Sequence, residues 1–179
     1  MIDKNQENKR LFFGLDFSQE NKAHIFNWLS HQVDDKRKSV LQSNLHLTLA
    51  FLPNVSPANE LLLIEYAKSL TFSSFKLRFA ETGYWPNTGI FFLKPCELVT
   101  PLNVLATSLR TEGERLGIYQ NPFDFHPHVT LKRNCKQQPE IKKAITPFEV
   151  EFKEFKLFHS TRVNNQLRYL PMKSFKLTC

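Results

Sequence analysis

Apolar residues recur at every second position through several short stretches of the chain. Residues 10–17 are rich in phenylalanine, and alternating Phe/Leu runs appear again at 148–158 and 166–176. Two shorter stretches of the same kind lie at 75–82 and 90–94. Because successive side chains on a strand point to opposite faces, this alternation is typical of β-strands with one buried face. The pattern therefore predicts extensive β-structure.

Three other segments carry the signals that start a helix. Ser18 stands before residues 19–33, whose apolar positions fall on one helical face. Ser-Pro at residues 56–57 and Thr-Pro at 100–101 each combine a capping side chain with a proline suited to the first helical turn. We therefore expect three longer helices that begin at or directly after these residues.

The ends of these helices carry fewer signals. The second helix is expected to end near Leu70, and Gly117 could close the third because glycine adopts the left-handed backbone of a helix C-terminus. A further short helix is expected at residues 140–144. Because no linker rich in Gly, Pro or Ser divides the chain, we expect residues 1–179 to form a single domain.

A short pattern of alternating polar and apolar residues occurs twice. His-Leu-Thr-Leu at residues 46–49 is followed, 82 positions later (128 − 46), by His-Val-Thr-Leu at residues 128–131. On a strand, the His and Thr of each copy share one face, while the apolar residues enter the core. We expect the first copy to lie on a strand over residues 45–52 that stops at Pro53-Asn54. The two histidines could then face one cleft.

The order of the expected elements favours an α+β fold. Each half of the chain contains a strand, a helix and a His-Thr strand, or a permuted version of that order. We expect two similar lobes, each built on an antiparallel sheet. The same order of elements would also fit a parallel sheet, so local patterning alone leaves this choice open.

The composition predicts a substantial hydrophobic core and an anionic partner. Hydrophobic residues make up 41% of the 179 residues, and 17 residues are phenylalanine, which argues against disorder. The formal net charge is +7, from 24 Lys and Arg against 17 Asp and Glu. Such a balance favours phosphate or nucleic acid as a partner. The basic residues are scattered apart from residues 36–38, which favours a local anionic site over a long duplex-binding surface.

The cysteines and the start of the chain bear on its compartment. Cys96, Cys135 and Cys179 are isolated and odd in number, so they predict neither a disulfide framework nor a cysteine-based zinc site. Residues 1–10 are polar and charged, unlike a secretory signal, and the longest aliphatic run, 61–64, is too short for a membrane span. We expect a cytoplasmic, monomeric protein without a membrane segment.

Two histidines and two threonines in this arrangement suit phosphodiester cleavage. His46 and His128 can divide the roles of base and acid because imidazole has an ordinary pKa of about 6.5. The hydroxyls of Thr48 and Thr130 can donate hydrogen bonds to phosphate oxygens. A 2′,3′-cyclic phosphate suits this minimal set because ring opening relieves strain, and the scheme needs no metal or other cofactor. If a ribose hydroxyl replaces water, the same site forms a phosphodiester bond, so weak ligation is an expected side activity.

Three further residues are candidates for substrate binding. Arg133 lies five residues after His128, so on a regular strand it faces away, unless a bulge or a strand end near Lys132 redirects it. Tyr84 and Trp85 lie between two expected strands. They could stack on a nucleobase, or they could cover the core instead.

These segments resemble a known family. Paired His-x-Thr motifs define the 2H phosphoesterase superfamily, and within it the chain more narrowly resembles the bacterial RNA 2′,3′-cyclic phosphodiesterases, historically called 2′-5′ RNA ligases. The matching segments span nearly the whole chain, at residues 10–16, 44–52, 125–133 and 155–169. One departure is Pro53, which stands where the family usually has glycine and suggests a different turn after the first motif.

The resemblance implies a two-lobed α+β fold with pseudo-two-fold symmetry, in which the histidines face each other across a central cleft. It implies hydrolysis of RNA 2′,3′-cyclic phosphate ends, or of cyclic nucleotides, to 2′-phosphomonoesters. It also assigns His46 as proton donor and His128 as proton acceptor, with Thr48 and Thr130 holding the phosphate and Arg133 assisting.

Other functions fit parts of the pattern. A related cyclic phosphodiesterase could act on ADP-ribose cyclic phosphate or on 2′-5′ oligonucleotides. A metalloenzyme could use His46, His126 and His128, although only Asp124 lies nearby as a further ligand. A catalytically idle module would bind RNA ends and leave the cyclic phosphate intact.

Overall fold

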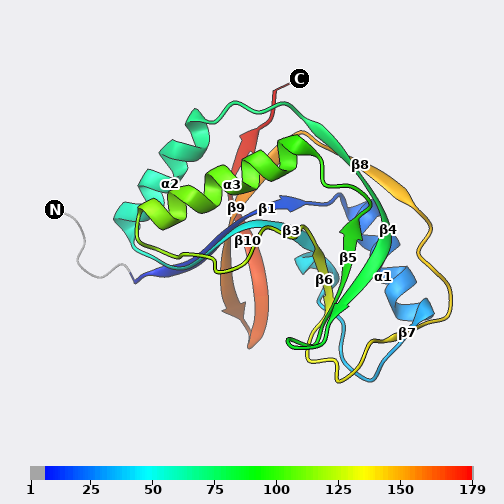
Figure 1. Ribbon diagram of the computed structural model, residues 1–179. Coiled ribbons are helices and arrows are strands. Elements are labelled where there is room, and N and C mark those ends of the chain that lie inside the picture. Colours follow the sequence, from blue (N-terminus) through cyan, green and yellow to red (C-terminus); the bar gives the residue numbers. More distant parts are fainter. Residues whose placement is uncertain (1–6, 179) are drawn as a thin grey trace.

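The computed structural model of the protein describes residues 7–178, so the expectations for residues 1–6 and for Cys179 fall outside it. Figure 1 shows a curled sheet with helices packed along it. In chain order the elements are β1 (Lys9–Asp16), α1 (Gln19–Gln32), β2 (Val33–Asp34), the 3-10 helix η1 (Gln42–Asn44), β3 (His46–Val55), α2 (Pro57–Ser69), β4 (Phe75–Trp85), β5 (Ile90–Pro95), α3 (Thr100–Arg115), β6 (Val129–Lys132), β7 (Glu140–Ile141), β8 (Phe148–Phe152), β9 (Glu154–Val163) and β10 (Gln166–Lys176).

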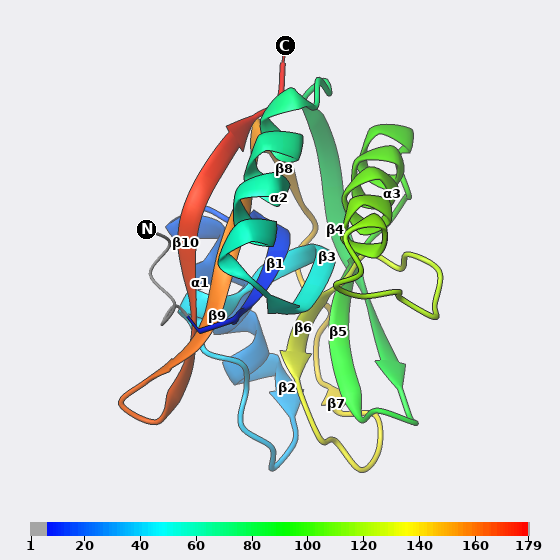
Figure 2. The same cartoon turned by 90° about the vertical axis from the view of Figure 1, so that its left-hand side faces the viewer.

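The main sheet has eight strands in the order β10-β9-β1-β3-β6-β5-β4-β8. All of its strand pairings are antiparallel, and the two four-stranded halves are joined where Leu47 of β3 pairs with Val129 of β6. Figure 2 shows β1, β9 and β10 on one side of the junction of β3 and β6, and β4 and β5 on the other. The expected α+β fold with two antiparallel halves is confirmed, and the halves form one continuous sheet.

The first two helices begin as the sequence predicts. The hydroxyl oxygen of Ser18 accepts a hydrogen bond from the Asn21 amide at 3.2 Å, and Ser56 caps α2 in the same way through the Asn59 amide at 3.2 Å. Each serine satisfies an amide that has no partner within the first helical turn. Pro57 occupies the first position of α2, where its missing N–H costs no hydrogen bond.

The start of α3 differs from the prediction by one residue. Val99 stands at the cap position and makes no side-chain capping bond, while Thr100 is already the first helical residue. Proline is accepted throughout the first helical turn, so Pro101 did not fix which residue precedes the helix. At the other end the prediction is confirmed, since Gly117 has a φ of +68° directly after the C-terminal cap residue Leu116.

Residues 140–144 do not form the expected helix. Glu140 and Ile141 form β7, which pairs antiparallel with β2 through Val33 and Asp34. Five residues gain few internal hydrogen bonds as a helix, so pairing with a neighbouring segment that buries Val33 is the more stable arrangement. This small second sheet ties the end of α1 to the loop that follows the second motif.

Pro53 does not end its strand. β3 continues to Val55, and the pairing with β1 shifts there, so that Pro53 and Asn54 together oppose the single residue Arg10. A bulge leaves one residue without ladder hydrogen bonds, and a proline at that place removes no donor that the sheet uses. The expected stop is therefore wrong, and the departure from the family pattern is absorbed within the strand.

The long run at residues 148–158 is divided at Lys153 into two strands that belong to different halves of the sheet. β8 pairs with β4 in one half, and β9 pairs with β1 in the other. The chain therefore crosses from one half to the other twice, once between β3 and β4 and once at Lys153. Both motif strands lie in the interior of the sheet, where neighbours on each side fix their position.

Phenylalanine and leucine dominate the core that supports these strands. Phe13, Phe79, Phe91 and Phe155 are among the largest fully buried side chains. Helix α3 packs closely on β3 at Gly113. A Cβ atom at this position would lie only 2.8 Å from the side chain of Leu52. Among residues 7–178 there is no helix with both the length and the apolar character that a membrane crossing requires.

Candidate active site

The pairing of Leu47 with Val129 sets the two motifs against each other. Both residues are fully buried at the junction of β3 and β6. Continuing this antiparallel register by one residue in each direction places each motif histidine opposite the threonine of the other motif. These pairs are His46 with Thr130 and Thr48 with His128. The two histidines are thus diagonal neighbours on one face, a relationship that places residues roughly 7–8 Å apart, with their Cβ atoms somewhat closer.

A cleft of about 720 Å³ opens over this junction, and both histidines and Thr48 contribute to its lining. Its further lining comes from β1, β3, the β9–β10 hairpin and the segments before and after β6, with Arg10, Phe12, Phe51, Asn121, Arg133, Ser160, Thr161, Arg162, Leu167 and Tyr169. Thr130 is half-buried and does not appear in this lining. The structure therefore brings three of the four motif side chains into one cavity.

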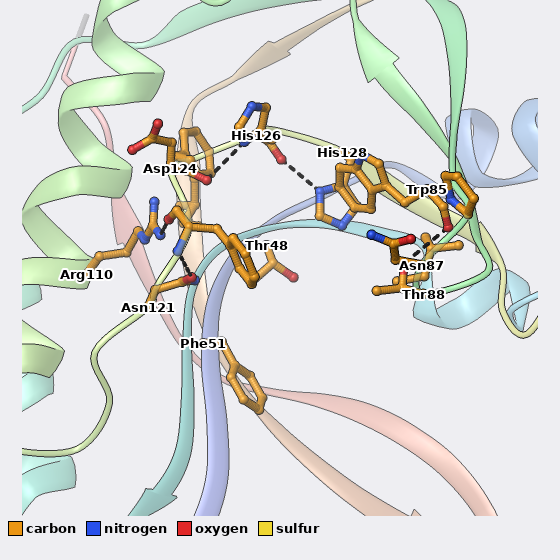
Figure 3. Close-up of a pocket in the computed structure, with 15 residues that line it drawn as sticks. Thr48, Phe51, Trp85, Asn87, Thr88, Arg110, Asn121, Asp124, His126 and His128 are labelled. Atoms are coloured by element: carbon orange, nitrogen blue, oxygen red, sulfur yellow. Dashed lines mark hydrogen bonds between the residues drawn. The ribbon is translucent and has the colours of Figure 1, made fainter.

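An adjoining cavity of about 540 Å³ lies on the other side of His128 (Figure 3). The two cavities share Thr48, Phe51, Asn121 and His128, so they form one cleft that is divided into two compartments. The second compartment is lined largely by aromatic and neutral residues of the β4–β5 turn and of the loop after α3. It includes Trp85, Pro86, Asn87, Thr88, Ile90, Arg110, Phe123, Asp124, Phe125 and His126.

His46 is held on two sides. Its Nδ1 lies 2.6 Å from the main-chain oxygen of Asn44, and its Nε2 lies 2.9 Å from the hydroxyl oxygen of Thr48. A carbonyl only accepts, so Nδ1 carries the hydrogen and Nε2 is the basic nitrogen of the neutral ring. The rings of Phe12 and Tyr169 pack against the imidazole, with centroids 4.6 and 4.8 Å away. The reactive nitrogen therefore points toward Thr48 in the cleft.

His128 repeats the Nδ1 contact of His46. Its Nδ1 donates to the main-chain oxygen of His126 at 2.8 Å, two residues earlier in the chain, as Asn44 is to His46. The ring is packed by Trp85 at a centroid distance of 4.6 Å and by Phe92 at 5.6 Å. Nε2 is again the nitrogen left for chemistry. The two motifs thus share the Nδ1 hydrogen bond to the carbonyl two residues earlier, as well as their sequence pattern.

Both imidazoles have lowered pKa values. Burial is the largest cause at His46, the charges of His128 and Arg133 add to it, and the pKa falls to about 4 although the Asn44 carbonyl opposes the change. Burial also lowers the pKa of His128, opposed by the His126 carbonyl and assisted by Arg133. Both rings are therefore neutral near pH 7 in the free protein, and a bound anion beside Arg133 would raise both pKa values.

Arg133 reaches the cleft because the second motif strand is irregular. The pairing of β5 with β6 shifts between Phe91–Lys132 and Phe92–Thr130, so Leu131 is an extra residue, and β6 ends at Lys132. A bulge reverses the alternation of side chains beyond it. This is the irregularity that the sequence analysis required for Arg133 to turn toward the motif histidines, and Arg133 lines the cleft with them.

Tyr84 and Trp85 are separated by the alternation of β4. Trp85 lines the second compartment and packs on His128. Tyr84 points the other way, packs against the core, and donates its hydroxyl hydrogen to the Cys135 main-chain oxygen at 3.0 Å. The structure thus brings only Trp85 of this pair to the site, and Tyr84 takes the core-covering position that the sequence left open.

Sequence reasoning did not single out Asn44, which is 5% exposed. Its side chain donates to the main-chain oxygen of Leu167 at 2.8 Å and accepts from the Tyr169 amide at 3.2 Å. Together with its carbonyl bond to His46, these contacts join the histidine to the β9–β10 hairpin. Its only signal in the sequence is its position two residues before the motif histidine.

A charged cluster lies behind the site. Asp16 pairs with His46 across β1 and β3, and its carboxylate contacts the ammonium groups of Lys22 at 2.7 Å and Lys156 at 3.1 Å. Burial raises the pKa of Asp16, but the two lysines outweigh it and leave that pKa below its ordinary value. Lys22 also donates to the Ser43 carbonyl at 3.1 Å, next to Asn44.

The metal-site alternative finds no supporting arrangement. Within residues 7–178, no three His, Cys, Asp or Glu side chains are grouped so that they could hold a metal ion. His126 is exposed, and its Nδ1 donates to the main-chain oxygen of Asp124 at 3.0 Å rather than meeting the carboxylate.

Known proteins share both the sequence and the architecture. The RNA 2′,3′-cyclic phosphodiesterase of Escherichia coli (strain K12) is 32% identical over 173 residues, which cover 96% of this chain and 98% of that protein. A protein of the same name from Archaeoglobus fulgidus is 30% identical over 132 residues, covering 69% of this chain and 74% of its own length. The crystal structure of E. coli LigT complexed with 3′-AMP aligns with a TM-score of 0.92 at 31% identity, over 97% of this chain and 100% of that one.

A sequence model of the 2′-5′ RNA ligase superfamily matches residues 22–164, a span that contains both His-x-Thr motifs. The resemblance seen in the motifs is thereby confirmed along most of the chain. On the family match, the relatives and the shared architecture together, the chain belongs to the 2′-5′ RNA ligase superfamily.

Proposed function

We propose that this chain hydrolyses the 2′,3′-cyclic phosphate ends of RNA to 2′-phosphomonoesters. The observation that supports this most directly is a pair of histidines in one cleft, each with Nδ1 fixed by a main-chain carbonyl, so that Nε2 is the nitrogen that can exchange a proton. The relatives named RNA 2′,3′-cyclic phosphodiesterase support the same reaction and the same class of substrate, RNA ends or cyclic nucleotides.

In the proposed reaction, water attacks phosphorus from the side opposite the ribose 3′ oxygen. His128 accepts the proton of the attacking water at Nε2 while the new P–O bond forms. The bond from phosphorus to the 3′ oxygen breaks, and His46 delivers a proton from its Nε2 to that oxygen. The product carries a 2′-phosphate and a free 3′ hydroxyl, and each histidine ends in the protonation state in which the other began.

Hydrogen-bond donors around the histidines would hold the phosphate. Thr48 lies in the cleft beside both rings, and Thr130 holds the equivalent position opposite His46. Arg133 supplies a positive charge that faces both imidazoles. Fixed donors of this kind stabilise the charge that develops on phosphate oxygens in the transition state.

The bound substrate would favour the protonation state of His46 that the reaction requires. In the free protein, burial and Arg133 keep the pKa of His46 near 4, so the proposed acid is uncharged at neutral pH. A cyclic phosphate carries a negative charge, which offsets Arg133 and favours the protonated ring. The substrate thereby helps to charge the group that protonates its own leaving oxygen.

Trp85 is the residue that we propose to stack on the terminal base. Its indole lines the second compartment next to His128, and aromatic stacking suits single-stranded nucleic acid because every base has a π face. Tyr84 has no part in this proposal, since its side chain belongs to the core face of β4.

The proposed reaction uses no metal or cofactor, and it is reversible in principle. The 5′ hydroxyl of a second RNA strand could replace water as the nucleophile while the 3′ oxygen leaves, so weak 2′-5′ ligation would use the same groups in the same positions. We also infer that residues 1–179 act as one monomeric domain in the cytoplasm. The chain crosses twice between the two halves of one continuous sheet, which supports the single domain.

Product analysis tests the proposed reaction. Adenosine 2′,3′-cyclic phosphate should give the 2′-phosphate at the same rate whether it is incubated with the protein in the presence or in the absence of a chelator.

Variants of the two motif histidines test the mechanism. His46→Ala and His128→Ala should each lower kcat by at least ~100-fold. The exposed residue His31 of α1 offers a matched control, and His31→Ala should retain full activity. Full activity in both motif variants would refute the mechanism. ADP-ribose cyclic phosphate and 2′-5′ oligonucleotides belong in the same assay and should react more slowly.

A modified leaving group tests the two assigned roles. When sulfur replaces the 3′ oxygen of the cyclic phosphate, the leaving thiolate needs little protonation. His46→Ala should then regain most of the lost rate, whereas His128→Ala should stay impaired because the base is still required. The opposite pattern would exchange the roles of the two histidines.

A further inference from the structure

The two compartments of the cleft differ in charge. The compartment that holds both motif histidines is lined by three guanidinium groups, Arg10, Arg133 and Arg162. The compartment beyond His128 is lined mostly by aromatic and neutral residues, and its lining includes one arginine, Arg110, and one carboxylate, Asp124. The electrostatic field would therefore orient an elongated anion along the cleft, with its negative charges toward β1 and β9.

Arg10 and Arg162 lie on the same face of the sheet as the first motif. Leu11 pairs with His159 across β1 and β9, so the next pair outward joins Arg10 to Ser160, and Arg162 follows two residues later on the same face. Arg10 is also two residues from Phe12, whose ring packs on His46. Two residues of a strand span roughly 7 Å. Arg10 therefore lies about one such step beyond Phe12, away from His46, and Arg162 lies about one step further.

Neither arginine is neutralised within the described part of the chain. None of the ion pairs among residues 7–178 includes Arg10, Arg133 or Arg162. The Arg10 guanidinium lies 4.7 Å from the centre of the Phe51 ring, and Arg162 donates to the Asn165 carbonyl at 3.3 Å in the hairpin turn. Both side chains are exposed and positioned by neutral partners, which leaves their charge available to a ligand.

The amount of charge exceeds what a cyclic mononucleotide can use. Such a molecule carries one negative charge, and Arg133 is the arginine that acts electrostatically on both motif histidines. An RNA chain adds one further phosphate for each nucleotide before the cyclic end. Arg10 and Arg162 are placed where those phosphates would lie if the terminal base occupied the aromatic compartment.

We propose, building on the function proposed above, that Arg10 and Arg162 bind the internucleotide phosphates that precede the cyclic end of an RNA chain. The substrate class is then an oligoribonucleotide with its terminal base beside Trp85 and its upstream backbone along β1 and the β9–β10 hairpin. A cyclic mononucleotide is a substrate that lacks these contacts.

Kinetics on two substrates test this assignment. The probes are adenosine 2′,3′-cyclic phosphate and the adenylyl dinucleotide that ends in the same cyclic phosphate. The wild-type kcat/KM should be at least tenfold higher for the dinucleotide. Arg10→Gln and Arg162→Gln should each lower the value for the dinucleotide by roughly 5-fold more than the value for the mononucleotide. Each change should also reduce the salt slope of log kcat/KM for the dinucleotide by about 0.7.

Lys173 provides a matched control on the same hairpin. It is exposed on β10 and lies outside the cleft lining, so Lys173→Gln removes one positive charge without touching the proposed path. Both substrates should respond to this change equally, if at all. Equal turnover of the two substrates by the wild type, or a dinucleotide preference that survives in the Arg10→Gln/Arg162→Gln double variant, would overturn the inference. Failure of the wild type to hydrolyse either substrate would instead reject the proposed function, and this inference with it.

Discussion

The main-chain carbonyl of Asn44 accepts a hydrogen bond from Nδ1 of His46 at 2.6 Å. The side chain of the same asparagine bonds to both Leu167 and Tyr169 of β10, and the Tyr169 ring packs edge-on against the His46 ring. One buried residue therefore orients the proposed acid and anchors the hairpin that forms a wall of the cleft. This relationship explains how a surface hairpin can be held in register with the site.

Replacement of Asn44 by alanine should destabilise the protein and loosen this wall. The change leaves the Leu167 carbonyl and the Tyr169 amide without their partner, and such a loss costs about 1–3 kcal/mol. We expect the free energy of unfolding in urea to fall by about 2 kcal/mol, together with a lower kcat. Asn103, exposed on α3, is the control, and Asn103→Ala should stay within about 0.5 kcal/mol of the wild type. An unchanged unfolding midpoint in Asn44→Ala would contradict the anchoring role.

The pH dependence of kcat/KM should be bell-shaped and centred below pH 6.5. This parameter reports the free enzyme, in which the pKa of His46 is about 4 and the pKa of His128 is below its ordinary value. The rate should fall below pH 4 as the second of the two rings becomes charged, and it should fall again above the pKa of His128, where neither ring holds a proton. A kcat/KM maximum at pH 8 would contradict these assignments.

Removal of the charge at Arg133 should move that profile toward higher pH. Arg133 lowers the pKa of both histidines, so Arg133→Gln lets both pKa values rise. NMR titration of the two imidazoles would measure the shift directly, without reliance on activity. Arg37→Gln is a control that changes the net charge equally at an exposed residue outside both compartments, and it should leave both titrations in place.

Loss of the Asp16 charge should be costly because it leaves a buried ammonium group unpaired. Lys22 is 5% exposed, and its ammonium group lies 2.7 Å from the Asp16 carboxylate. Asp16→Asn should lower the free energy of unfolding by about 3 kcal/mol at pH 7. Because the pKa of Asp16 is lowered in the folded state, the wild type should lose this stability as the pH falls through that pKa, and the difference between the proteins should shrink. Glu154→Gln, which breaks the more exposed pair with Lys156, should cost less than about 1 kcal/mol.

Substitution of Gly83 should disturb the packing around His128. A Cβ atom at this position would overlap the ring of Phe92, which packs against both Trp85 and His128. Gly83→Ala should therefore destabilise the protein by about 1–3 kcal/mol and lower the activity. The double variant Gly83→Ala/Phe92→Leu, which restores space, should recover part of the stability. A wild-type melting temperature for Gly83→Ala alone would show that the ring can move without cost.

The local pattern of apolar and polar residues predicts much of the fold. The serine caps of α1 and α2, the strands with buried Phe and Leu, and the alternation of the two motifs all follow from interactions within a few residues. Errors arose where distant segments compete. Pairing with β2 turned residues 140–144 away from a helix, and the bulge opposite Arg10 allowed β3 to continue through Pro53.

By itself, the sequence determined that each motif places a histidine and a threonine on one face of a strand, because side-chain alternation is a property of the single strand. It also determined the family, through paired motifs that are specific only together. The tertiary structure decided the register of Leu47 with Val129, the bulge that turns Arg133 into the cleft, and the choice of Trp85 over Tyr84 at the site. Strand pairing and bulges depend on residues that are far apart in the chain, and no pattern within one segment encodes them.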